Sequence, residues 1–136
     1  MKLSTAMPSH RKTSLTAGIL YLLTFVSIPS IALYSNVKSD NFILGAGPDT
    51  GAIIAGVLEV IVALAGIATA VVLFPMLKKQ REGFALGLVA SRTLEAACIF
   101  VGVAFLMTVV HLRQSGPGSD SLVVSNALVS LYDRIF

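Results

Sequence analysis

Residues 83–112 read GFALGLVASRTLEAACIFVGVAFLMTVVHL, and this stretch decides the fold of the 136-residue chain. It is long and apolar enough to cross a bilayer as one helix. Arg92 and Glu95 stand near its middle, where a charged side chain is costly unless it has a partner. The sequence therefore predicts a membrane-spanning helix that depends on its neighbours.

The two charges make this helix marginal on its own. A charge at the centre of a span costs about 2.5–3.5 kcal/mol, whereas each Leu, Ile, Val or Phe returns about 0.3–0.6 kcal/mol. The stretch holds fourteen of these apolar residues, worth roughly 4–8 kcal/mol. Since the charges together cost roughly 5–7 kcal/mol, we expect the helix to need packing partners.

Spacing along this helix predicts which residues share a face. Arg92 and Glu95 are three residues apart, so their side chains can form an ion pair. Gly83, Gly87 and Ser91 precede Glu95 at steps of four residues, which places small residues on the same side. We expect these three to be helix-packing residues and the polar pair to face the bundle rather than lipid.

Three interpretations of Arg92 and Glu95 remain open at this point. In the first, they form a structural ion pair that fixes helix packing. In the second, residues 83–95 form an interfacial amphipathic helix, and the uncharged residues 96–112 span the membrane alone. In the third, the pair lines a polar path for a proton, an ion or a small solute.

Composition places the whole chain in the membrane class. Hydrophobic residues make up 55% of it and charged residues only 12%, against about 25% charged residues in soluble domains. The net charge of +3 does not indicate nucleic-acid binding, because the basic residues flank apolar segments as topology signals do. The single cysteine, Cys98, reads as a small buried residue, and His10 and His111 are too far apart to share a metal.

The start of the chain predicts a basic tail followed by one helix. Residues 1–13 form the tail, and residues 14–35 form a first span that is too long for the core of a signal peptide. Pro29 removes one backbone hydrogen bond and is a candidate kink. Ser27 and Ser30 are placed to bond the freed carbonyl groups.

Two further segments complete the expected bundle. Residues 51–77 predict the second span, with Glu59 about 12 Å from its first residue. Residues 14–112 thus form a three-helix membrane region. Residues 113–136 predict an outer loop and a truncated fourth helix, because the last fifteen residues extend only about 22 Å. The expected fold class is an all-α integral membrane helical bundle, with three transmembrane helices plus the start of a fourth.

Lysine and arginine counts predict the orientation of these helices. The tail before the first span has three such residues, loop 36–50 has one, turn 78–82 has three and loop 113–121 has one. Positive residues gather on the cytoplasmic side of a membrane. This alternation predicts a multi-pass protein of the cell (inner) membrane, with its N-terminus and the 78–82 turn in the cytoplasm.

The second and third spans also resemble a known family. Glu59, the exit segment LFPMLKKQ at residues 73–80 and the R-x-x-E-A pattern at residues 92–96 follow one another. This order is similar to that of the bacterial multi-pass membrane family catalogued as domain of unknown function 4386, over most of residues 11–115. The resemblance implies no activity, since the family has none assigned. Its members tend to be longer, which implies that this chain is a fragment or a shortened form.

Two functions fit these residues. The first is a structural or regulatory membrane component, favoured by the small-residue faces and the marginal third helix. The alternative is a transporter or channel-like protein for a small solute, ion or proton that uses intramembrane Glu59, Arg92 and Glu95. The sequence contains no nucleophile–base pair, metal-ligand cluster or phosphate loop, so we expect no enzyme, catalytic residue, metal or cofactor. The expected partners are the lipid bilayer and either another copy or other membrane helices, without nucleic acid.

Overall fold

The computed structural model describes residues 9–39, 42–45 and 47–135, and all regular structure within them is helical. In chain order the elements are α1 (Ser9–Leu23), the 3-10 turn η1 (Thr24–Ser27), α2 (Ile28–Tyr34), α3 (Thr50–Lys78), α4 (Glu82–Gln114) and α5 (Ser121–Ile135). Three segments are long and apolar enough to cross a membrane, namely Arg11–Tyr34, Thr50–Lys78 and Glu82–Gln114. The predicted fold class is therefore confirmed, with α5 as the shorter fourth helix.

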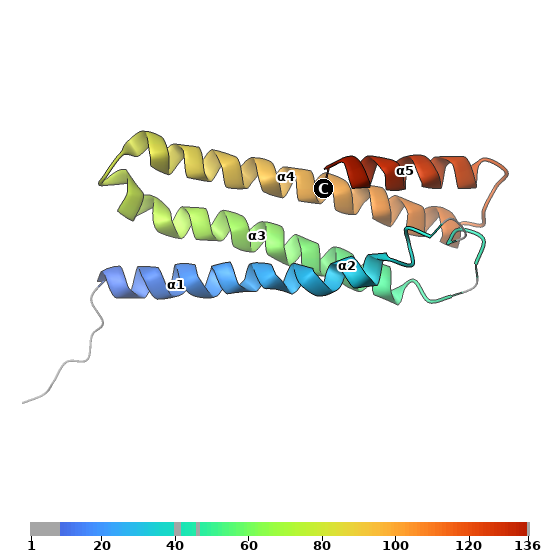
Figure 1. Ribbon diagram of the computed structural model, residues 1–136, viewed down its shortest axis with the longest axis horizontal. Coiled ribbons are helices and arrows are strands. Elements are labelled where there is room, and N and C mark those ends of the chain that lie inside the picture. The colour runs from blue at the N-terminus through green and yellow to red at the C-terminus, as the bar shows by residue number, and fades with distance from the viewer. Residues whose placement is uncertain (1–8, 40–41, 46, 136) are drawn as a thin grey trace, which may run out of the picture.

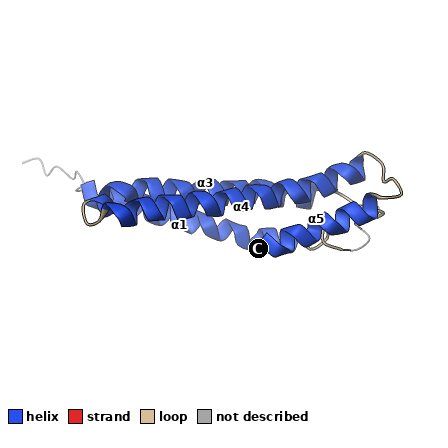
Figure 2. Cartoon of the chain, turned by 90° about the horizontal axis from the view of Figure 1, so that it is seen from above, coloured by secondary structure: helices blue, strands red, loops and turns tan. Residues whose placement is uncertain are grey.

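The helices lie side by side along one axis. α1, η1 and α2 together form one rod beside α3, and α3 and α4 form an antiparallel hairpin (Figure 1). α5 turns back along one half of α4 and ends beside the middle of that helix. Seen from above, the long helices keep this common direction (Figure 2). This arrangement brings the ends of α2 and α5 close to the middle of α3.

A 3-10 turn, η1, separates α1 from α2 just before Pro29. Because Pro29 has no N–H to offer the carbonyl of Phe25, that carbonyl accepts the N–H of Ile28 instead. The hydroxyls of Ser27 and Ser30 each donate to the carbonyl three residues earlier, at 2.8 and 2.6 Å. The first span is thus interrupted where Pro29 predicts it, but the two serines bond the carbonyls of Thr24 and Ser27 rather than the carbonyl of Phe25 that Pro29 leaves without its usual donor.

Helix boundaries differ from the predicted ones in two places. α4 is continuous from Glu82 to Gln114, so residues 83–95 do not form a helix separate from residues 96–112. In the predicted basic tail, residues 1–13, the first eight lie outside the described residues. α1 already begins at Ser9, because nothing in the following residues breaks a helix before the apolar segment.

Small residues on α3 allow α4 to pack closely against it. Ala55 and Ala63 are almost completely buried. A Cβ atom added to Gly56 would stand 3.2 Å from Met107 Cε, which is closer than an ordinary contact. Close approach of small residues is a main source of packing between helices in membranes. The close α3–α4 contact therefore fixes the relative position of Glu59 on α3 and of Arg92 and Glu95 on α4.

Arg113, in the last turn of α4, fastens the loop between α2 and α3. Its guanidinium donates to Asp49 Oδ1 at 2.8 Å and to the carbonyls of Gly45 and Gly47 at 2.8 and 2.6 Å. It also lies over the Phe42 ring, 4.4 Å from the ring centroid. The sequence predicts only a loop from Arg113 onward. No local pattern around Arg113 indicates that its partners lie more than sixty residues away.

Candidate functional site

Glu59 of α3 joins three helices through its carboxylate. Tyr34, at the end of α2, donates to Oε2 at 3.2 Å, and Tyr132 of α5 donates to Oε1 at 2.9 Å. All three residues are buried, and Glu59 is only 7% exposed. The two tyrosine rings meet edge to face, with centroids 5.7 Å apart. Both carboxylate oxygens of Glu59 thus accept a hydroxyl donor from a different helix.

The surrounding core explains why these side chains meet. Both tyrosines belong to the larger apolar cluster, which also contains Val37, Phe42, Ala52, Ala55, Leu106, Val109 and Val110. A tyrosine has an apolar ring and a polar tip, so it can fill such a cluster and still deliver a hydrogen-bond donor. The alanines of α3 leave the space that the two rings occupy. Apolar packing of the two rings and the hydrogen bonds from their hydroxyls therefore both hold the Glu59 carboxylate in place.

An ion pair lies beside this junction. Lys38, in the loop after α2, contacts Asp133 of α5 with 2.7 Å between Nζ and Oδ1. The Lys38 ammonium also stands 4.5 Å from the centroid of the Tyr132 ring. These contacts hold α5 to the end of α2, and they bring two opposite charges close to the buried carboxylate.

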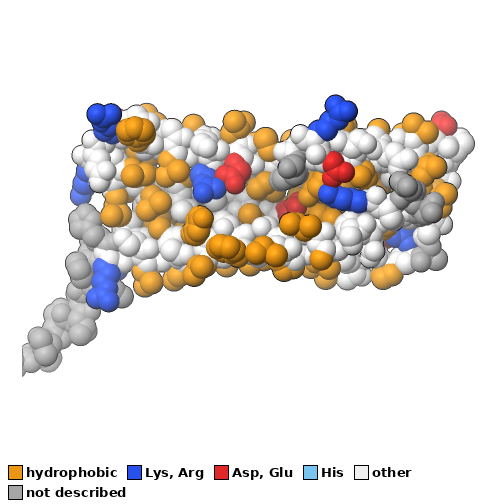
Figure 3. Space-filling model, viewed as in Figure 1, with side chains coloured by type: hydrophobic (Ala, Val, Ile, Leu, Met, Phe, Trp, Pro, Cys, Tyr) orange, Lys and Arg blue, Asp and Glu red, His pale blue; other side chains and the backbone are white. Residues whose placement is uncertain are grey.

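A cavity of about 500 Å³ opens next to Glu59. Its polar lining comes from η1, α2 and the loop after it, α3, α4 and α5: Ser27, Ser30, Lys38, Glu59, Glu95, Tyr132 and Asp133. The remaining lining residues are apolar and come from α2, α3 and α4. The space-filling view shows acidic and basic side chains in the middle of this face as well as toward its ends, with many apolar side chains between them (Figure 3).

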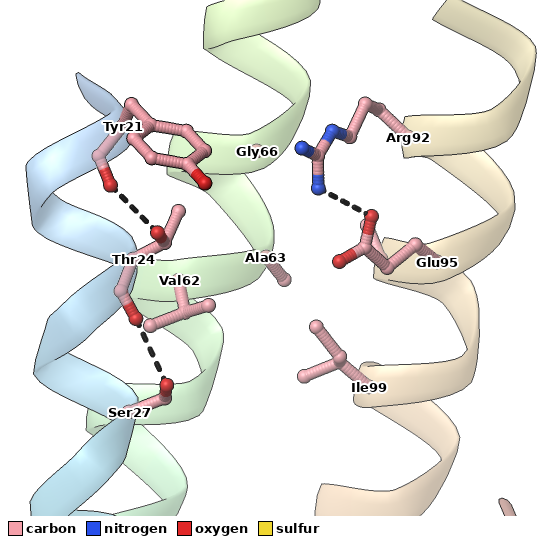
Figure 4. Close-up of a pocket in the computed structure, with 10 residues that line it drawn as sticks. Tyr21, Thr24, Ser27, Val62, Ala63, Gly66, Arg92, Glu95 and Ile99 are labelled. Carbon is pink, nitrogen blue, oxygen red and sulfur yellow. Dashed lines mark hydrogen bonds and ion pairs between the residues drawn. The ribbon is translucent and has the colours of Figure 1, made fainter. Parts of the chain in front are cut away.

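A second, smaller cavity of about 240 Å³ holds Arg92 and Glu95. Both side chains project from α4 toward α1, above the small residues Ala63 and Gly66 of α3 (Figure 4). As their spacing predicts, they form an ion pair, with 2.6 Å between Arg92 Nη1 and Glu95 Oε2. Glu95 is half-exposed, and the pair therefore lines a groove rather than a sealed core.

The two cavities are neighbours, because Ser27, Val62, Glu95 and Ile99 line both of them. Glu59 and Arg92 thus line two adjacent cavities without contacting each other directly. No group of three His, Cys, Asp or Glu residues suited to a metal occurs among the described residues. The polar groups that line the two cavities are carboxylates, hydroxyls and the cationic side chains of Lys38 and Arg92. The carboxylates and hydroxyls can bind a proton, a small cation or water.

The residues predicted to pack α4 against another helix do not do so within the described chain. Gly83, Gly87 and Ser91 are exposed, and a Cβ atom added to either glycine would meet nothing within 4 Å. The side of α4 that faces α3 instead carries Ala96 and Ile99. This correction has a simple cause, since spacing identifies a common face but does not say which face meets α3.

Several functional side chains were missed by sequence reasoning. Tyr34 is 1% exposed and donates to Glu59, which its place at the end of the first span does not indicate. Tyr132, Lys38 and Asp133 had no assigned role, because only the return of α5 brings them to α3. Cys98, predicted to be buried, is exposed.

Over the residues that the structure describes, these features define an all-helical protein with three helices long and apolar enough to cross a membrane and a polar region between them. Residues 16–136 match the family described as domain of unknown function DUF4386, and the chain belongs to that family. The match includes α5, and so it extends past the residues on which the resemblance was recognised. No curated protein and no solved structure matches the chain.

Proposed function

We propose that the protein is a structural or regulatory membrane component whose helices are held in register by Glu59. The observation that carries this proposal is the double hydrogen bond of its carboxylate to Tyr34 and Tyr132. In a membrane, helices gain little from the hydrophobic effect between them, so packing and interhelical hydrogen bonds decide how they assemble. The hydrogen bonds of Glu59 link α2, α3 and α5, so a change at this one residue is expected to alter the packing of all three helices.

The test compares Glu59→Gln and Arg92→Leu with the wild-type protein in its native membrane. We expect both variants to change assembly or abundance, with the larger change for Glu59→Gln, because Glu59 is buried and Arg92 lines an open groove. The exposed loop variant Asp120→Asn is the control for the loss of a carboxylate. Loss of a solute flux at normal abundance and assembly would contradict a structural role.

A second candidate function is a route for a proton, an ion or a small solute. It is favoured by the continuous lining that Glu95 shares between the two cavities. Polar residues at membrane depth often mark such routes. Under either function we propose the cell membrane as the location, with the N-terminus and the 78–82 turn on the cytoplasmic side.

Cysteine accessibility separates the two candidates. In a Cys98→Ala background, single cysteines replace Glu59, Arg92 or Glu95, and a membrane-impermeant thiol reagent is added from each side. Labelling at all three positions would favour the route, since it requires water along the whole cavity. Labelling confined to residues 92 and 95 would favour the structural role, with Glu59 in a dry junction. The side from which these two react also tests the proposed orientation.

A further inference from the structure

The charges around the two adjacent cavities do not balance. Five charged side chains line them, namely Lys38, Glu59, Arg92, Glu95 and Asp133. Four of these form two ion pairs, Lys38 with Asp133 at 2.7 Å and Arg92 with Glu95 at 2.6 Å. Among the described residues, Glu59 forms no ion pair of this kind, and its neighbours are the neutral hydroxyls of Tyr34, Tyr132 and Ser30. When Glu59 is ionised, the lining of the two cavities taken together therefore carries one net negative charge.

The groups nearest to Glu59 are hydroxyls, and those of Ser30 and Tyr132 also line the larger cavity. The hydroxyls of Tyr34 and Tyr132 each use their proton on Glu59, and the hydroxyl of Ser30 uses its proton on the carbonyl of Ser27. A hydroxyl that donates its proton keeps lone pairs on the oxygen. Such oxygens, together with a carboxylate, are the ligands that hard cations prefer.

The interrupted first span adds a second element of such a site. η1 and the start of α2 lie beside the cavity, where Ser27 and Ser30 form part of its lining. Helices that break at membrane depth expose backbone carbonyls and helix ends, and cation sites in membrane proteins are commonly built there. The break before Pro29 thus coincides with the uncompensated carboxylate.

We propose that the cavity beside Glu59 binds one monovalent cation, whose occupancy tightens the contact of α3 with α2 and α5. A single positive charge neutralises the lining. A divalent ion would leave a charge of the opposite sign on the two cavities together. The inference rests on the Glu59 junction of the proposed function, but it does not require that the cation cross the membrane.

The experiment measures thermal unfolding of the full chain, purified in detergent, by far-ultraviolet circular dichroism. Sodium, potassium or methylammonium chloride replaces N-methylglucamine chloride at constant pH and ionic strength, because the large N-methylglucamine ion is a poor fit for a site among buried hydroxyls. We expect a saturable rise in Tm with at least one of the small cations. The three salts distinguish an alkali-metal ion from an ammonium group as the occupant.

Variants then locate the site. We expect Glu59→Gln to weaken the apparent affinity at least roughly tenfold, since it removes the unpaired charge. Asp120→Asn removes a carboxylate from the exposed loop before α5 and is expected to leave the cation response unchanged. The proposal would be overturned by a Tm that is the same in all salts. It would also be overturned by a rise in Tm with the cation that is the same in Glu59→Gln as in Asp120→Asn. A rise in Tm on acidification without any dependence on the cation would mean that Glu59 holds a proton, and would overturn it as well.

Two further variants keep the proposal testable should Glu59→Gln fail to fold. Glu95→Gln leaves Arg92 unpaired and cancels the net charge of the lining, so it should weaken cation binding. Lys38→Met leaves Asp133 unpaired and should strengthen it. Shifts in the same direction, or no shifts, would refute the charge argument. A Glu59→Gln protein that is less stable but keeps the full cation response would leave the structural role intact and reject the cation site.

Discussion

Tyr132 Oη donates a 2.9 Å hydrogen bond to Glu59 Oε1, although 73 residues separate the two in the chain. This bond ties α5 to the middle of α3 without any direct packing of small residues between them. Because the acceptor is a buried carboxylate, replacing either Tyr132 or Glu59 leaves a buried polar group without its partner and lowers the free energy of unfolding. The position of α5 therefore depends on the hydrogen bond that Glu59 accepts from Tyr132.

Tyr132→Phe is predicted to destabilise the protein by about 1–3 kcal/mol, because Glu59 Oε1 loses its donor while it stays buried. The measurement is reversible unfolding in mixed micelles of detergent and dodecyl sulfate. Tyr21→Phe is the matched control, since Tyr21 is exposed on α1. Equal stability of the two variants would show that the hydroxyl of Tyr132 contributes nothing to the junction.

Arg113→Lys is predicted to loosen the loop between α2 and α3. A lysine keeps the charge but cannot bond Asp49, Gly45 and Gly47 together, because it lacks the planar fork of the guanidinium. We expect a loss of about 1.5–3 kcal/mol and faster amide hydrogen exchange in residues 42–50.

Arg81→Lys serves as the control for this prediction, since Arg81 is exposed in the turn between α3 and α4. Unchanged exchange in the loop of the Arg113→Lys protein would mean that the loop is held by its apolar residues alone. Phe42 and Ile43, both buried, would then be the next residues to replace.

Gly56→Leu is predicted to push α3 and α4 apart. Even a Cβ atom at this position would stand 3.2 Å from Met107 Cε and 3.5 Å from Val103 Cγ1, and a larger side chain must displace both. Overpacking of this kind costs about 1–3 kcal/mol. Gly18→Leu, at an open position on α1, should be neutral in the same unfolding assay. A Gly56→Leu protein as stable as the Gly18→Leu control would contradict the close contact.

Local rules were sufficient for some of these features and insufficient for others. Hydropathy and length gave the three spans, the missing N–H of Pro29 gave the break in the first one, and a spacing of three gave the pair of Arg92 and Glu95. Each of these depends on residues within one helical turn or one continuous segment. The partners of Glu59 lie 25 and 73 residues away. Their meeting depends on how far α5 runs back along α4, which no local pattern specifies.

Gly87→Leu tests the one predicted surface that has no partner within the described chain. Gly87 shares its exposed face of α4 with Gly83 and Ser91. A leucine at residue 87 meets nothing within 4 Å of its Cβ atom, so we expect the unfolding of the isolated chain to be unchanged. The expected association of this face with another helix predicts, in contrast, weaker cross-linking between copies in membranes, because small residues are what allow backbones to approach. Unchanged cross-linking would assign the face to lipid, whereas lower stability of the isolated chain would show that the face packs within the chain itself.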